Sequence, residues 1–127
     1  MIASGLVALW GAGNPASGPG REVFEKRCTG CHSLDGVKVG PPLRGIFGRR
    51  AAAYGSFPYS AALQKSALTW NEATLERWLT DPESLVPDND MAFRMSRAEE
   101  RTAIIEYLKQ LSEKPARPPS GAARGNR

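Results

Sequence analysis

The chain has 127 residues, which is the size of a single domain with a limited apolar core. Its net charge at pH 7 is +4, but the residues from Glu113 onward hold four basic side chains and one acidic one, which leaves 13 basic against 12 acidic side chains in residues 1–112. Because the excess positive charge belongs to the C-terminal end, and no aromatic-interleaved basic patch is present, the composition argues against nucleic-acid binding.

The first ten residues, MIASGLVALW, form an apolar stretch far short of the roughly 20 residues that span a bilayer. They are similar to the apolar region of a secretory signal, followed by small residues up to Ala12, although no Lys or Arg precedes them. We expect residues 1–19 to be a leader or membrane anchor that ends in a Pro/Gly/Ser linker, Asn14–Gly20. A buried N-terminal segment is the alternative.

A first helix is predicted to run from about Arg21 into the segment CTGCH, residues 28–32. The C-x-x-C-H pattern is typical of covalent haem attachment. Each thiol can add across one haem vinyl group, and the imidazole that follows can ligate the iron from one side. We therefore expect one haem c, attached through Cys28 and Cys31, with His32 as an axial ligand.

Other uses of these residues fit less well. A structural zinc site takes four nitrogen or sulfur ligands, whereas the chain has two Cys and one His. A thioredoxin-like C-x-x-C is expected beside a βαβ pattern, and no such alternation appears. A disulfide between Cys28 and Cys31 stays possible but leaves His32 unexplained.

Gly- and Pro-rich loops follow, notably Gly36–Gly48, and a weakly marked short helix is predicted around Ser60–Gln64. The second main helix is expected to begin at Thr69, where Thr69 and Glu72 match a T-x-x-E capping box. It should stop before Pro82, because the residue before a proline disfavours the helical conformation.

The third main helix is expected to begin at Ser96, with Glu99 completing another capping box. Its apolar stripe consists of Ile104, Ile105, Leu108 and Leu111. We expect Pro115 to end it. With no internal repeat and no alternating strand pattern, the prediction is an all-α domain over residues 20–112, followed by a disordered basic tail over 113–127.

Whether the iron has a second axial ligand from the protein distinguishes electron carriers from ligand-binding and catalytic haem proteins. The chain has a single His, so ligation by two histidines is excluded within a monomer. The natural candidate is a methionine thioether. Met91 lies in the loop between the second and third helices, and Met95 is the fallback. Taken alone, both methionines would be read as fillers of gaps in the core.

Several further segments occur in a specific order: GPPLRGIFGR over residues 40–49, Thr69-Trp70, Pro87 four residues ahead of Met91, and IIEYL over residues 104–108. Together with CTGCH, they resemble the class I cytochromes c, of the mitochondrial type and its bacterial relatives, over about residues 20–111. The resemblance implies the class I cytochrome c fold, with three main helices and loops wrapped around one haem. It implies Met91 as the second axial ligand. It also implies that Gly20 and Phe24 pack on Ile104 and Tyr107.

The resemblance implies supporting roles around the haem. The carbonyl oxygen of Pro41 would accept a hydrogen bond from the non-ligating ring nitrogen of His32 and so fix the imidazole tautomer. Buried carboxylates need donors or counter-charges. The resemblance implies that the haem propionates are held by Arg49, Tyr59, Trp70 and Asn89. It also implies that Phe93 packs near the exposed haem edge.

The chain also departs from the mitochondrial pattern. Leu63 stands where those proteins carry an Asn tied to a buried water network, and Trp78 replaces a Tyr whose hydroxyl approaches the Met sulfur. Asp90 precedes Met91 in place of a Lys, and Asp88 adds a second acid. We hypothesise that the polar network on the Met side and the reduction potential are altered. The docking partner of the mitochondrial proteins should not be assumed.

These observations predict a monohaem, monomeric electron carrier that works between respiratory or other periplasmic redox proteins. The expected partners are a donor of the quinol–cytochrome c oxidoreductase type and a terminal oxidase or other acceptor. No enzymatic activity is expected, because the acidic pairs Glu72/Glu76 and Glu99/Glu100 are explained by solvation on helix surfaces. The apolar leader favours a bacterial periplasm over the mitochondrial intermembrane space.

Two alternatives differ in class. The chain could be the haem module of a larger redox enzyme, with its N-terminal segment as a linker or anchor. If Met91 does not ligate, it could instead be a haem sensor or catalyst with an open iron site.

Overall fold

The structure is a computed structural model, and it describes residues 18–113. Within this range it is all-α, as predicted, with one isolated antiparallel bridge between Arg50 and Thr69. The helical segments are α1 (Pro19–Val23), a π-helical turn over Phe24–Cys28, α2 (Ala61–Lys65), α3 (Glu72–Thr80), α4 (Pro82–Leu85) and α5 (Ala98–Ser112). Most of the predicted leader and basic tail lies outside the described residues.

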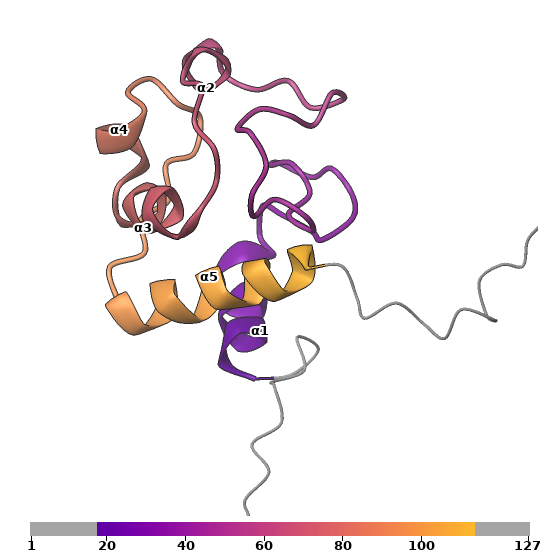
Figure 1. Ribbon diagram of the computed structural model, residues 1–127, viewed down its shortest axis with the longest axis vertical. Coiled ribbons are helices and arrows are strands. Elements are labelled where there is room, and N and C mark those ends of the chain that lie inside the picture. Colours follow the sequence, from indigo (N-terminus) through magenta and orange to yellow (C-terminus); the bar gives the residue numbers. More distant parts are fainter. Residues whose placement is uncertain (1–17, 114–127) are drawn as a thin grey trace, which may run out of the picture.

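Helices α1 and α5 cross one another at one side of the molecule (Figure 1). A Cβ atom on Gly20 would lie 2.5 Å from Tyr107 Cβ and 2.6 Å from the carbonyl oxygen of Ala103, so only glycine allows this close approach. The rings of Phe24 and Tyr107 have centroids 5.8 Å apart, and Ile104 is buried. The crossing therefore combines a close backbone contact with an aromatic pair.

The first helix begins earlier than predicted. Pro19 and Gly20, which the sequence placed in a linker, belong to α1, and Gly20 is buried in the crossing. Proline is well suited to the first turn of a helix, because its missing N–H would have no intrahelical partner there. The linker prediction is therefore wrong at its last two residues.

The predicted capping box at Thr69 is wrong. Asn71 caps α3: its side chain accepts a hydrogen bond from Thr74 N at 2.9 Å, while Thr74 Oγ1 accepts one from Asn71 N at 2.8 Å. The physical reason lies in a tertiary contact. The backbone N–H of Trp70 donates to the carbonyl oxygen of Arg49 at 2.8 Å. The carbonyl oxygen of Trp70 accepts a hydrogen bond from Gly48 N at 2.6 Å. These two bonds hold residues 69 and 70 extended.

The capping box predicted at Ser96 is also wrong. Helix α5 begins at Ala98, and its N-cap residue, Arg97, makes no side-chain capping bond. Met95, just ahead, donates its backbone N–H to Leu79 at 2.7 Å and so ties this stretch to the end of α3. At the other end α5 stops at Ser112, ahead of Pro115, which lies outside the described residues.

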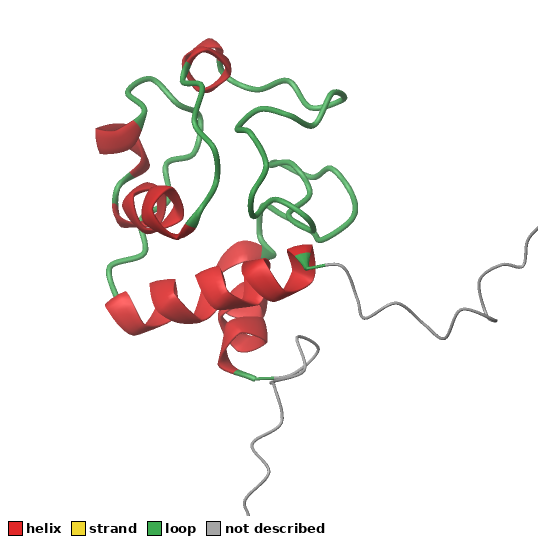
Figure 2. Ribbon diagram, viewed as in Figure 1, coloured by secondary structure: helices red, strands yellow, loops and turns green. Residues whose placement is uncertain are grey.

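Two short helices complete the fold. Helix α2 forms within one residue of its predicted place, with Ser60 Oγ accepting from Leu63 N at 3.1 Å. Helix α3 ends before Pro82, as predicted, but Pro82 then starts α4, which the sequence analysis missed. Among residues 18–113 no helix is both long and apolar enough to span a bilayer. Figure 2 shows that loops, not helices, form much of the side of the molecule opposite the α1–α5 crossing.

Candidate haem site

A cavity of about 530 Å³ lies between the helices and these loops. This volume is within the range of cofactor sites. Every site residue predicted from the sequence borders the cavity: Cys28, Cys31, His32, Pro41, Arg49, Tyr59, Trp70, Asn89, Met91 and Phe93. The structure thus brings together side chains from five separate stretches of the chain.

The two thiols enter from the end of the π-helical turn. The backbone closes tightly after Cys28, whose carbonyl oxygen accepts from His32 N at 2.8 Å and from Cys31 N at 3.1 Å. Both thiols are free, with Cys28 half-buried and Cys31 exposed. Burial raises the pKa of the Cys28 thiol to about 11. No group of three His, Cys, Asp or Glu among residues 18–113 could hold a metal ion on its own.

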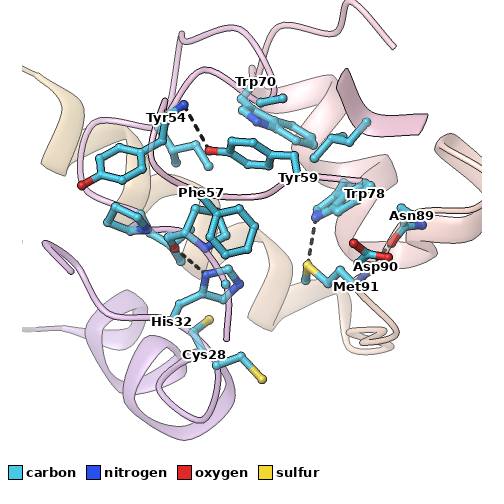
Figure 3. Close-up of a pocket in the computed structure, with 18 of the residues that line it drawn as sticks. Cys28, His32, Tyr54, Phe57, Tyr59, Trp70, Trp78, Asn89, Asp90 and Met91 are labelled. Carbon is cyan, nitrogen blue, oxygen red and sulfur yellow. Dashed lines mark hydrogen bonds between the residues drawn. The ribbon is translucent and has the colours of Figure 1, made fainter. Parts of the chain in front are cut away.

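The imidazole of His32 is oriented by the loop that follows it. Its Nδ1–H donates to the carbonyl oxygen of Pro41 at 2.7 Å, which leaves Nε2 as the nitrogen with a free lone pair (Figure 3). Burial lowers the pKa of His32, the Pro41 hydrogen bond opposes that shift, and the charge of Lys38 lowers it further. The lowered pKa favours the neutral ring, which is suited to ligate a metal through Nε2.

Gly40 gives the His32 ring its space. A Cβ at Gly40 would lie 2.7 Å from Nδ1 and 2.9 Å from Nε2. The Gly40 N–H also donates to the carbonyl oxygen of Cys31 at 2.7 Å, which fixes the loop against the haem-attachment segment. The sequence analysis quoted Gly40 only as part of a motif, and it missed this close approach.

Met91 enters the cavity from the loop between α4 and α5, on the side across from His32 (Figure 3). The indole N–H of Trp78 donates to Met91 Sδ at 3.2 Å. Met95, the fallback ligand, is a core residue with 1% exposure and does not border the cavity. Of the two candidate thioethers, Met91 is thus the one that reaches the site.

Polar groups also line the cavity. Tyr59 OH accepts the backbone N–H of Tyr54 at 3.2 Å, which leaves its own proton free to donate to a ligand. Arg49 also borders the cavity, and so does Arg50, which the sequence analysis did not select. The doubled arginine after the GIFG segment was the signal for it. Two guanidinium groups and a phenol suit a ligand that carries carboxylates.

Asn89 behaves differently from the propionate donor that the resemblance implied. Its Oδ1 accepts from Met91 N at 2.6 Å, and its Nδ2 donates to the carbonyl oxygen of Val86 at 2.9 Å. A second, longer bond of 3.4 Å runs from Nδ2 to Glu83. Because both ends of the amide are engaged within the loop, a propionate would have to displace one of these bonds.

The wall beside Met91 is largely apolar. Leu63 borders the cavity where the mitochondrial pattern has a polar Asn, and Trp70 and Trp78 pack edge to face with centroids 5.2 Å apart. A flat, apolar cofactor that carries carboxylates fits a cavity lined by both apolar and basic side chains. The two thiols and the imidazole also line this cavity. The residues present therefore fit haem.

Comparison with known proteins agrees with this geometry. A sequence profile of the family described as Cytochrome c matches residues 17–112. The chain belongs to the cytochrome c family. It is 42% identical to the cytochrome c2 iso-2 of Magnetospirillum molischianum, over 66% of this chain and 90% of that protein. It is 40% identical to the cytochrome c of Chlamydomonas reinhardtii, over 72% of this chain and 85% of that protein.

The fold agrees as well. The structure of cytochrome cH from Methylobacterium extorquens matches with a TM-score of 0.69 and 38% identity, covering 77% of this chain and 99% of that one. The fold is thus that of the class I cytochromes c, as the sequence predicted. As a member of this family, the chain binds haem c and is a monohaem electron carrier, not an enzyme.

The acidic pairs noted in the sequence lie on helices away from the cavity. Each of the four carboxylates forms an ion pair with a basic side chain: Glu72 with Lys109, Glu76 with Arg101, Glu99 with Arg97, and Glu100 with Arg27. None of them borders the cavity.

Proposed function

We propose that this cytochrome c carries electrons with His32 and Met91 as the two axial ligands of a haem joined to Cys28 and Cys31. The observation that carries this proposal is the position of Met91 Sδ at the cavity wall across from His32, where it receives the Trp78 N–H at 3.2 Å. When bound, haem iron takes up and releases one electron at a time. A thioether opposite an imidazole favours the reduced state and raises the potential.

The chain's own residues would keep structural change on electron transfer small. His32 is held by Pro41 and confined by Gly40, and Met91 is held by Trp78. Because both ligands are oriented before any change of charge, little must rearrange. Arg49 and Tyr59 would meet the haem carboxylates and offset the cost of burying them.

We further propose export to a bacterial periplasm and exchange of electrons with a quinol–cytochrome c oxidoreductase-type donor and a terminal oxidase or similar acceptor. The apolar residues 1–10 support export. The similarity to the bacterial cytochromes c2 and cH supports the compartment. Docking would be transient, through a small interface at the exposed part of the site.

The ligation proposal is tested by comparing Met91→Leu with Met95→Leu. In the oxidised wild-type protein we expect the red absorption band of a methionine–iron bond and no carbon monoxide binding after reduction. Met91→Leu should lose the band and bind carbon monoxide. Met95→Leu should keep the band, because that sulfur lies in the core. Loss of the band in Met95→Leu, with Met91→Leu unchanged, would contradict the assignment.

A further inference from the structure

The loop that carries Met91 contains a hydrogen-bonded turn of its own. Asn89 Oδ1 accepts from Met91 N at 2.6 Å, so the side chain of Asn89 holds the backbone of the proposed ligand two residues on. At its other end Asn89 Nδ2 donates to the carbonyl oxygen of Val86 at 2.9 Å. Val86 is itself buried in the core. Asn89 therefore ties Met91 to a fixed point of the fold.

Glu83, on α4, supports this turn from outside. Its Oε1 accepts the backbone N–H of Asp88 at 2.9 Å, and its Oε2 accepts from Asn89 Nδ2 at 3.4 Å. Asp88 has a φ of 69°, in the left-handed region that favours glycine. A hydrogen bond to its N–H helps to hold this conformation. Glu83 does not border the cavity, so it can act on the ligand only through the loop.

We propose that Asn89, supported by Glu83, is a positioning residue for the Met91 sulfur, a role that rests on the proposed ligation by Met91. The thioether is held at its tip by Trp78 and at its backbone by Asn89. Both contacts are needed to keep a flexible, unbranched side chain in one place. Without Asn89, the Met91 N–H loses its partner and the loop gains freedom, so the sulfur competes less well with other ligands.

The alternative role of Asn89, as a donor to a haem propionate, makes a different prediction for Glu83. A propionate donor would not need Glu83. A positioning turn would, because Glu83 bonds both Asp88 N and Asn89 Nδ2. Substitution of Glu83 is therefore the variant that separates the two roles.

The test uses the full-length, haem-loaded protein in its oxidised form and titrates it with imidazole, which displaces a weakly held thioether. The readout is loss of the methionine–iron absorption band. For Asn89→Ala we expect imidazole to bind about tenfold more tightly, the equivalent of one hydrogen bond of about 1.4 kcal/mol. The reduction potential should fall, because a thioether favours the reduced state. For Glu83→Ala we expect a smaller change of about threefold in the same direction, because its two hydrogen bonds to the loop are exposed and one of them is long. Ser84→Ala, at an exposed neighbour on α4, is the matched control and should leave both quantities unchanged.

Each other result has a definite meaning. If the band is present and imidazole affinity is the same in the wild type and in Asn89→Ala, the positioning role is wrong while ligation by Met91 stands. If Asn89→Ala does not load haem, an imidazole affinity in Glu83→Ala equal to that of the wild type overturns the positioning role of Asn89. An equal shift in Ser84→Ala also overturns it, since the effect would be general loosening of α4. If the wild type itself lacks the band, the ligation proposal fails and the positioning role fails with it.

Discussion

At the scale of single residues, two side chains that border the cavity, Trp78 and Leu63, differ from the mitochondrial pattern. Trp78 takes the place of a Tyr but still offers one donor, its indole N–H, to Met91 Sδ at 3.2 Å. Leu63 borders the same cavity with no polar atom in its side chain. The sequence predicted that this network would be altered. The structure adds that the donor to sulfur is kept.

Trp78→Phe tests the effect of that donor. The indole is replaced by a smaller aromatic ring without an N–H, so the sulfur should donate more electron density and stabilise the oxidised state. We expect the reduction potential to fall by the equivalent of up to about 1 kcal/mol, the usual net value of one hydrogen bond. Potentiometric titration measures this. Trp78→Tyr, which offers an O–H instead, should recover part of the difference, and a rise in potential in Trp78→Phe would contradict the assignment.

Gly40→Ala tests the space around His32. The new Cβ would lie 2.7 Å from Nδ1, so the ring must turn and weaken its hydrogen bond to Pro41. We expect a lower yield of haem-loaded protein and an altered visible spectrum. Gly36→Ala is the control in the same loop, where the new Cβ would be 3.5 Å from Ser33 Oγ, an ordinary contact. Normal yield and spectrum in Gly40→Ala would show that the loop relaxes freely.

At the scale of elements, sequence patterns located the helices but not their first residues. The apolar stripe of α5 was predicted correctly, because Ile104, Ile105 and Leu108 are buried. The capping boxes at Thr69 and Ser96 were wrong, since tertiary backbone bonds hold the neighbouring residues extended. A capping motif in the sequence does not reveal which backbone groups are already engaged elsewhere.

One side chain that the sequence analysis did not select joins two helices to the Met91 loop. Arg101 on α5 donates to Glu76 on α3 at 2.6 Å and to the carbonyl oxygen of Met95 at 2.8 Å, and its side chain is 13% exposed. Glu76 is 44% exposed, so the carbonyl oxygen of Met95 is the acceptor that most needs the shielded Arg101 side chain as its partner. Nothing in the local sequence distinguishes Arg101 from the other arginines. Its role depends on the packing of α3 against α5.

Arg101→Ala should therefore destabilise the protein by about 1–3 kcal/mol, measured by chemical denaturation of the haem-loaded form. Lys109→Ala is the matched control. Lys109 joins the same two helices through an exposed pair with Glu72 at 3.2 Å, and exposed pairs add little to stability. Equal losses in the two variants would contradict a special role for Arg101.

At the scale of the whole molecule, the sequence predicted which residues would meet, because covalent attachment and a single His limit the choices severely. The C-x-x-C-H pattern predicted Cys28, Cys31 and His32 as site residues, and the family resemblance predicted Met91. All four border one cavity. What the sequence could not give was the local geometry: the engaged amide of Asn89, the confinement of His32 by Gly40, and the additional Arg50. These depend on how the loops return to the cavity, and loop conformation is set by many weak contacts at once.

The most direct measurement is the visible absorption spectrum of the purified protein in its oxidised and reduced states. The account predicts the reduced-state bands of a haem joined through two thioether bonds, and a methionine–iron band in the oxidised state. Carbon monoxide should leave the reduced spectrum unchanged. A colourless protein, a spectrum of haem with intact vinyl groups, or a reduced spectrum that shifts at once with carbon monoxide would contradict it.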